Sequence, residues 1–369
     1  MAVQNMQLFH LDKIIYIIMN QLNYYKNNIY NYNNNKNIDI IYYHKDCPDG
    51  TMCCSLWLLN NLNKTESHIF PIQPSDIIEI DKKYYKLNIN IIFLDVVPRN
   101  IYKFITLLDK KTSIVIIDHH IGNTNLIKSI RSFPNITIDF KPNSLYGATK
   151  QVLDRFIHIL LQPQIDFAIK IAAMDMWNRN EYIDVNNLNF GIKYYCYKKQ
   201  IKMLSPDTFI ELSYQGNKAI NYFVKIGAKW FSKTETFILK QFNKKKICEL
   251  TKIVHYKKYN IGIVDLSNIF NKSKYAKQKS FMSGVICLML EKDIKLKNKL
   301  FGKEINTLAF INNNGVSLRI ISDPNKELNM DFLAKKICRG GGHTAAAGCA
   351  LQYFVEYFSN EYKYNNIDV

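Results

Sequence analysis

Short apolar runs alternate with longer segments of helical length from about residue 38 onward. Near-continuous Ile and Val runs of this length are typical of strands covered on both faces, as in a parallel α/β sheet. The pattern therefore predicts an α/β domain over residues 37–185. Its predicted strands are 38–43, 90–94, 113–117 and 136–138, and its predicted helices are 51–62, 100–108, 148–161 and 165–174.

The pattern changes on either side of this domain. Residues 1–36 combine an amphipathic stretch with an Asn/Tyr-rich run, which predicts an N-terminal extension with a low-complexity linker. Residues 186–245 lack strand alternation and predict a helical connector. A smaller α+β domain is expected over 246–355, followed by a tail over 356–369. Its predicted strands lie near 252–255, 261–264, 307–311 and 316–321, and its predicted helix is 331–338.

Composition excludes several classes of protein. Hydrophobic residues make up 47% of the 369 residues and charged residues 22%, which argues against a mostly disordered chain. No run approaches the roughly 20 uncharged apolar residues that span a membrane, and no secretory leader is visible. Eight cysteines without a C-x-x-C pair argue against a zinc ribbon and predict reduced thiols. We therefore expect a soluble, intracellular protein of the cytoplasm, with no membrane partner.

The net charge of +18 has two interpretations. A basic protein of this kind suits a polyanionic partner such as nucleic acid. Overuse of Lys, Asn, Ile and Tyr, which AT-rich coding produces, explains the charge equally well. Because the lysines are spread along the chain rather than clustered, charge alone does not choose between the two.

Candidate chemistry follows three of the predicted strands at the point where each ends. The first strand is followed by His44, Asp46 and Asp49, the second by Asp95, and the third by Asp118, His119 and His120. Ligands of open α/β sheets bind beyond the carboxyl ends of the strands, so these side chains are expected in one crevice. Asp175, at the end of an Ala-rich helix, is a fourth contributor. Such a cluster of carboxylates is costly unless cations neutralise it, and Asp and His without Cys match Mn²⁺ or Mg²⁺.

Each of these residues also has an ordinary structural interpretation. An Asp after a strand is usually a turn former or a helix cap, and neighbouring histidines are usually surface or core residues. The repetition of one strand-to-ligand arrangement three times favours the functional interpretation.

At this point the sequence resembles the DHH phosphoesterase superfamily. HKDCPDG, LDVVP, IDHH and AAMDMW follow the four motifs of that superfamily in order, and SLRI and CRGGGHTAAAG resemble its C-terminal DHH-associated domain with the GGGH motif. The resemblance covers residues 38 to 350. It implies a parallel-sheet catalytic domain, a helical linker and a smaller α+β substrate-binding domain.

The resemblance implies specific roles for these residues. The implied metal ligands, for two Mn²⁺ ions with Mg²⁺ as the alternative, are His44, Asp46, Asp49, Asp95, His119 and Asp175. Asp95 is the best candidate to bridge both ions, Asp118 orients the histidine pair, and His120 lies near the scissile phosphate. Many members space the first-motif carboxylates as D-x-D, whereas two residues separate Asp46 from Asp49. Which metal Asp46 or Asp49 binds, and whether His44 binds directly, stays open, with Asp49 favoured over Asp46.

The C-terminal motifs are expected to bind the substrate. Glycines let the backbone approach a phosphate closely, and an arginine offers a bidentate fork for phosphate. The expected substrate-binding residues are Arg319, Arg339, Gly341, Gly342 and His343. A glycine-rich helix stop is the ordinary interpretation of the same motif.

The expected activity is a manganese-dependent, two-metal phosphodiesterase that hydrolyses short RNA or DNA oligonucleotides to mononucleotides. Two cations generate the nucleophile from water and clamp the attacking and leaving oxygens. A cleft between the two domains is expected to favour short or end-bound substrates. The alternatives are a hydrolase of cyclic dinucleotides or other small phosphoesters, a RecJ-like single-strand exonuclease, and a degenerate nucleic-acid-binding subunit. The sequence predicts no oligomeric state.

Overall fold

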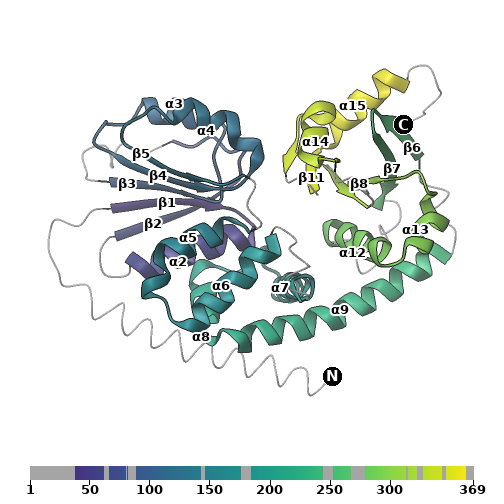
Figure 1. Cartoon of the computed structure of the whole chain (residues 1–369), viewed down its shortest axis with the longest axis horizontal. Helices are drawn as coiled ribbons and strands as arrows, with labels where there is room; N and C mark the ends of the chain where they lie inside the picture. Colours follow the sequence, from purple (N-terminus) through teal and green to yellow (C-terminus); the bar gives the residue numbers. More distant parts are fainter. Residues whose placement is uncertain are drawn as a thin grey trace. The chain divides into compact units, whose positions relative to one another are not determined.

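The computed structural model describes residues 38–61, 66–79, 81, 89–142, 146–175, 184–243, 252–266, 279–312, 315–321, 327–342 and 346–362. They form two compact units, divided after Ala228. The first unit contains a five-stranded sheet and the second a six-stranded sheet (Figure 1). The α/β class predicted from the sequence is confirmed.

The sheet of the first unit is parallel throughout, with the strand order β2-β1-β3-β4-β5. Its strands are β1 (Ile38–His44), β2 (Glu66–Ile72), β3 (Ile89–Leu94), β4 (Ser113–Asp118) and β5 (Ile136–Phe140). Four of them were predicted, whereas β2 was not. It carries polar residues and Pro71, which lacks the N–H needed inside a sheet, and such a strand is tolerated at a sheet edge.

Both faces of this sheet are covered by helices (Figure 1). Ile40 and Tyr42 belong to a core with α3 (Ile101–Thr106) and α4 (Thr124–Ile130). Ile41 and Tyr43, which alternate with them, belong to the core on the other face. That second core includes residues of α2 (Pro48–Asn61), α5 (Ala148–Phe156) and α6 (Gln162–Asp175). Burial on both faces explains why the strands are almost continuously apolar.

The region predicted as a connector is helical. It contains α7 (Val185–Lys199), α8 (Pro206–Gln215) and α9 (Asn217–Asn243). Leu188 of α7 and Phe209 of α8 are buried in the same core as α2 and α5, so these two helices complete the first unit. None of the described helices is long and apolar enough to cross a membrane.

The second unit is a mixed sheet with helices, in the strand order β10-β11-β9-β8-β7-β6. Its strands are β6 (Lys252–Tyr256), β7 (Tyr259–Asp265), β8 (Thr307–Asn312), β9 (Gly315–Ile320), β10 (Gly341–Gly342) and β11 (Ala346–Ala350). Its helices are α12 (Lys279–Lys292), α13 (Ile294–Phe301), α14 (Met330–Cys338) and α15 (Leu351–Tyr362). Phe354 and Phe358 of α15 are buried in the core beneath α14, so part of the predicted tail belongs to this fold.

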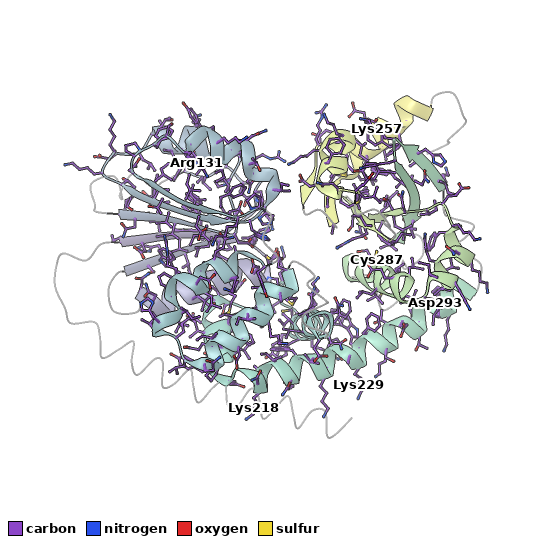
Figure 2. All side chains as sticks on the ribbon, in the orientation of Figure 1. Arg131, Lys218, Lys229, Lys257, Cys287 and Asp293 are labelled. Atoms are coloured by element: carbon purple, nitrogen blue, oxygen red, sulfur yellow. A yellow bond between two sulfur atoms is a disulfide. The ribbon has the colours of Figure 1, made fainter. Side chains whose placement is uncertain are left out.

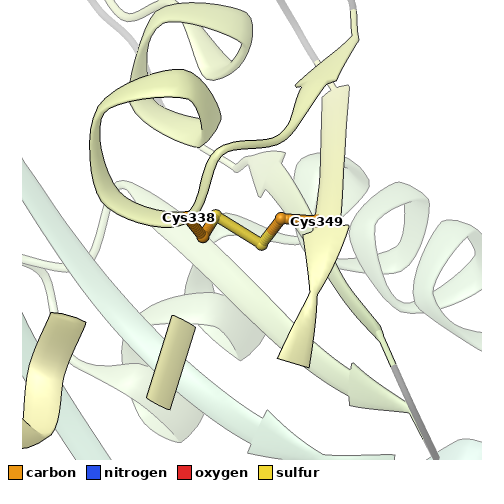
Figure 3. Close-up of a disulfide and its surroundings, with 2 residues drawn as sticks. All are labelled: Cys338 and Cys349. Atoms are coloured by element: carbon orange, nitrogen blue, oxygen red, sulfur yellow. A yellow bond between two sulfur atoms is a disulfide. The ribbon is translucent and has the colours of Figure 1, made fainter. Parts of the chain in front are cut away.

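A disulfide joins Cys338, the last residue of α14, to Cys349 on β11 (Figure 3). This corrects the prediction that the thiols are reduced. The packing of α14 against β11 brings the two Cα atoms to 5.9 Å, a normal separation for a disulfide. The sequence showed only two cysteines eleven residues apart, without a pattern that predicts a pair. The free cysteines of the described residues are Cys47, Cys53, Cys54, Cys196 and Cys287.

Reduction of this disulfide is expected to destabilise the chain by about 2–3 kcal/mol, because the closed loop is short and its closure entropy is correspondingly modest. Denaturant unfolding with and without a reducing agent measures the difference. Cys349→Ser is expected to resemble the reduced wild-type chain and to be insensitive to the reductant. Sensitivity of Cys349→Ser equal to that of wild type would assign the effect to something other than this bond.

Candidate metal centre

The three strand-end motifs lie on three adjacent strands, β1, β3 and β4. His44 is the last residue of β1, Asp95 directly follows β3, and Asp118 is the last residue of β4. Because the strands are parallel, these ends meet at one edge of the sheet. His119 and His120 follow Asp118, Asp49 lies in the first turn of α2, and Asp175 ends α6.

The side chains converge into three overlapping groups of possible metal ligands. In each group the donor atoms lie within 4.8 Å of one another. The groups are His44–Cys47–Asp95, Asp95–His119–His120, and Asp49–His119–Asp175. Asp95 and His119 each belong to two of them. We call these seven residues the donor cluster.

The geometry of Asp95 places its carboxylate at the centre of the cluster. Its N–H donates to the carbonyl of Ile117 at 2.8 Å and extends the ladder between β3 and β4 by one residue. Its φ of 60° then turns the chain sharply, a conformation that Asp tolerates better than most residues. The side chain is fully buried, with His119 Nε2 3.1 Å from Oδ1 and His44 Nδ1 3.3 Å from Oδ2.

Asp49 also holds the N-terminus of α5. Its carboxylate accepts hydrogen bonds from the N–H groups of Ala148 (2.6 Å) and Thr149 (3.1 Å). The carbonyl of Asp49 accepts from Thr149 Oγ1 at 3.0 Å. The same carboxylate lies 3.7 Å from His119 Nε2. A helix N-terminus favours negative charge, so α5 fixes this carboxylate in place beside the cluster.

Asp118 positions His120. Its Oδ1 lies 2.8 Å from His120 Nδ1, and its Oδ2 accepts from Asn123 Nδ2 at 2.7 Å. Asp118 is fully buried, which fixes the orientation of the ring. The contact of Asp118 with His120 agrees with the expected orienting role, while Asn123 and Thr149 are supporting residues that no sequence signal indicated.

The two central carboxylates differ in their electrostatics. Burial, with the negative charges of Asp95 and Asp175, raises the pKa of Asp49 well above its usual range. Burial acts in the same direction on Asp95, but the imidazoles of His119 and His120 outweigh it and hold the pKa of Asp95 well below its usual range. Burial opposes the charge on His120, yet Asp118 prevails and raises the pKa of His120 to about 9. The raised pKa of His120 and the lowered pKa of Asp95 both reflect the attraction between the imidazoles and the carboxylates of the cluster.

The cluster fits divalent cations. Asp95 Oδ1 is buried, with His119 Nε2 at 3.1 Å and His120 Nδ1 at 3.6 Å. Carboxylate oxygens and imidazole nitrogens in this density are the ligand set of Mn²⁺, Mg²⁺ and related ions. Asp95 and His119, shared between groups, are the residues that could serve two ions.

The structure treats the two carboxylates of the first motif differently. Asp49 is fully buried in the cluster, whereas Asp46 is exposed and belongs to none of the three groups found among the described residues. Its φ of 59° marks a left-handed turn directly before Cys47. The thiol of Cys47 takes the place expected for Asp46, in a group with His44 and Asp95. The sequence analysis had given Cys47 no role.

The glycines of the C-terminal motif serve the packing of the second unit. A Cβ on Gly340 would lie 2.1 Å from the carbonyl oxygen of Gly348, and one on Gly342 would lie 2.6 Å from that of Ala346. The N–H of Gly342 donates to Asp331 Oδ1 at 3.0 Å. The N–H of Gly340 donates to the carbonyl of Ala334, and the left-handed residue that ends α14 is Arg339 rather than a glycine. Gly341, which with Gly342 was expected to bind the substrate, is half-buried in β10.

The two arginines near these motifs lie in different surroundings. Arg319 is half-buried on β9, where its Nε donates to Ser317 Oγ at 3.2 Å. Arg339 follows α14 in a left-handed conformation (φ 52°), with its guanidinium over the ring of Tyr353 at 4.8 Å. His343 lies outside the described residues. Their roles in substrate binding, and the expected cleft, stay predictions.

Comparisons with known proteins give matches among solved structures alone. No protein-family model matches the chain, and no curated protein matches it. An exopolyphosphatase-related protein from Bacteroides fragilis is 15% identical, with a TM-score of 0.40, and the match covers 89% of this chain and 93% of that one. The pGpG-specific phosphodiesterase PggH from Vibrio cholerae is 14% identical, with a TM-score of 0.40 and coverage of 89% and 98%. RecJ from Thermus thermophilus in complex with Mn²⁺ is 11% identical, with a TM-score of 0.48 and coverage of 89% and 52%.

The positions of the four motifs in the fold agree with the resemblance found in the sequence. Four motifs occur in a fixed order, three of them end adjacent parallel strands, and their buried Asp and His side chains converge. In these features the chain resembles the DHH phosphoesterase superfamily.

Proposed function

We propose that the chain is a phosphoric diester hydrolase that uses two divalent cations, Mn²⁺ or Mg²⁺, to hydrolyse short oligonucleotides to mononucleotides. One observation carries the proposal: three motifs on adjacent strand ends bring Asp and His donors together in overlapping groups that share Asp95 and His119. When bound, two cations supply a nucleophile from water at neutral pH and neutralise the charge that develops on phosphate. The dependence on Mn²⁺ or Mg²⁺ and the choice of short oligonucleotides as substrates are both part of this proposal.

The protein's own residues hold and orient this chemistry. Asp49 is fixed by the N-terminus of α5 and His120 by Asp118, so neither side chain has to reorganise during the reaction. His120 belongs to the donor cluster and is held by Asp118, so it can donate a hydrogen bond to a phosphate oxygen of a substrate bound there. Asp95 and Asp118 are both fully buried, so bulk water does not reach their carboxylates.

Product analysis tests the proposal. Purified full-length chain with Mn²⁺ is incubated with labelled RNA and DNA of two to five nucleotides, a 24-mer, a cyclic dinucleotide and pyrophosphate. The double variant Asp118→Ala, His119→Ala is the control. We expect mononucleotides from the short ladder with wild type and none with the variant.

The other outcomes distinguish the alternatives. Preferred cleavage of the cyclic dinucleotide would favour a small-phosphoester hydrolase. Cleavage of none of the substrates, with binding of the 24-mer retained, would contradict the enzyme proposal and favour a nucleic-acid-binding subunit.

A second candidate, a RecJ-like activity on longer single strands, is favoured by the surface of α9. Five exposed lysines follow one another along this helix at intervals of seven, four, four and seven residues, which places them on one face. They are Lys218, Lys225, Lys229, Lys233 and Lys240. None of them forms an ion pair with any described residue. Figure 2 shows Lys218 and Lys229 on the same side of the helix.

Replacing three of these lysines, Lys225, Lys229 and Lys233, by Ala is expected to reduce the salt dependence of single-strand binding. Each lost phosphate contact lowers the slope of log K against log salt by about 0.7, so we expect a reduction of about 2. Fluorescence anisotropy with a labelled 24-mer measures it. The control, with the same change of charge, replaces the exposed Lys103, Lys110 and Lys111. Equal slopes for both triple variants would contradict a role for this face.

A further inference from the structure

Cys47 lies where a metal ligand is required. Its Sγ, an imidazole nitrogen of His44 and a carboxylate oxygen of Asp95 lie within 4.8 Å of one another. The three residues come from separate parts of the chain: the end of β1, the residue before α2, and the residue after β3. Three different donor types at this spacing can bind one cation together.

Two further observations point to a ligand at this position. Asp95, the partner of Cys47 in the group, is fully buried, and its Oδ2 lies 3.3 Å from Nδ1 of His44, the third member of the group. The carboxylate of Asp46, which the motif pattern places nearby, is exposed and outside the donor groups, so His44 and Asp95 obtain their third donor from the thiol.

The backbone holds Cys47 in this position. Its carbonyl accepts hydrogen bonds from the N–H of Thr51 at 3.0 Å and from Thr51 Oγ1 at 2.8 Å, which makes Cys47 the N-cap residue directly before α2. Pro48 follows at the first helical position, where its fixed φ suits the helix. The thiol donates to Asp175 Oδ1 at 3.8 Å, so it points toward the cluster.

We propose that Cys47 is a thiolate ligand of the cation held by His44 and Asp95, and that this position accepts Zn²⁺, Co²⁺ or Fe²⁺ in preference to Mg²⁺. Thiolate is a soft ligand that suits these ions, whereas Mg²⁺ prefers oxygen. The thiol loses its proton when the cation binds, and the proton passes to solvent or buffer. The inference rests on the proposed metal centre and adds to it a ligand and an ion preference.

Absorption spectroscopy of the full-length chain with Co²⁺ tests the inference directly. A thiolate bound to Co²⁺ gives a sulfur-to-metal charge-transfer band in the near ultraviolet, which oxygen and nitrogen ligands do not give. We expect the band in wild type and in Cys53→Ser, a buried thiol of α2 outside the donor groups. We expect no band in Cys47→Ser. Co²⁺ binding to wild type without a band, or a band that persists in Cys47→Ser, would overturn the proposal.

A third variant tests the ion preference. Cys47→Asp exchanges the soft donor for a carboxylate, so we expect its affinity for Zn²⁺ relative to Mn²⁺ to fall at least about tenfold. Competition titrations measure the ratio. An unchanged ratio would contradict the preference.

A measurement on the unaltered chain covers the case in which the variants fail to fold. Zn²⁺ is expected to slow the alkylation of Cys47. Peptide mass spectrometry measures the rate of this alkylation, with Cys196 as the internal reference. Equal alkylation rates with and without Zn²⁺ would contradict the proposal.

Hydrolytic activity is measured separately. Hydrolysis without a cobalt–sulfur band would leave the phosphodiesterase proposal standing and remove Cys47 alone. A band without hydrolysis of any substrate would do the reverse.

Discussion

Asp95→Asn is expected to abolish cation binding at the shared position and to lower the rate of phosphodiester hydrolysis at least about a thousandfold, equivalent to about 4 kcal/mol. The reason is position: Asp95 belongs to two of the three donor groups, and its carboxylate is surrounded by His44, His119 and His120. An amide keeps the shape of the side chain but loses the negative charge that attracts two cations.

Thermal unfolding gives a readout of this prediction that does not depend on knowing the substrate. A cation at about 100 times its Kd stabilises the folded chain by about 2.7 kcal/mol, which corresponds to a rise in Tm of about 5–10 °C for a unit of this size. We expect that rise for wild type with Mn²⁺, its reversal by a chelator, and little or no rise for Asp95→Asn.

Asp39→Asn is the matched control. Asp39 is also buried, but it lies at the opposite end of β1, where Trp57 Nε1 and Asn90 Nδ2 donate to its carboxylate at 3.2 and 2.9 Å. This variant is expected to keep the full Mn²⁺-induced rise in Tm even if its stability is lower. If Asp95→Asn retained the rise as well, the donor cluster would not be the cation site.

The course of β1, β3 and β4 could be predicted from the sequence because strands buried on both faces must be apolar at nearly every position. The residues that end them then had to meet, since parallel strands present their carboxyl ends at one edge. β2 escaped this reasoning because an edge strand is free to carry Glu66 and Pro71. Its position decides little about the cluster, because none of the cluster's residues comes from β2.

The choice between neighbouring residues could not be predicted. Asp46 and Cys47 adjoin in the sequence, and only the left-handed turn at Asp46 determines which side chain enters the cluster. Similarly, the sequence did not indicate that Gly340 and Gly342 permit close packing of the chain against β11, and the expected phosphate-binding role of the motif stays a prediction. Spacing along a chain does not specify backbone dihedral angles, so both outcomes depended on tertiary structure.

Gly147 leaves room for the carboxylate of Asp49, a role that the sequence did not indicate. It directly precedes α5, in a conformation (φ −65°, ψ 177°) that any residue can adopt, so its importance is steric rather than conformational. A Cβ at this position would lie 2.5 Å from both carboxylate oxygens of Asp49. Such a contact forces Asp49 away from His119 or pushes α5 outward.

Gly147→Ala is therefore expected to remove one of the two cations and to lower activity by at least about a hundredfold, a loss of about 2.7 kcal/mol in transition-state stabilisation. The His44–Cys47–Asp95 group does not include Asp49, so one cation should still bind. Metal analysis after equilibrium dialysis should give a stoichiometry near one for the variant and near two for wild type. Gly315→Ala, whose added Cβ would meet its nearest atom at 3.4 Å, is the control and should resemble wild type.

A double-mutant cycle separates this mechanism from a general loss of stability. If Gly147→Ala acts through Asp49, adding it to Asp49→Ala should cost little further activity, because the carboxylate it displaces is already absent. Independent sites would instead give additive losses. Additive losses, or two cations bound to Gly147→Ala, would contradict this mechanism. Either result would show that the position of Asp49 does not depend on the absence of a side chain at residue 147.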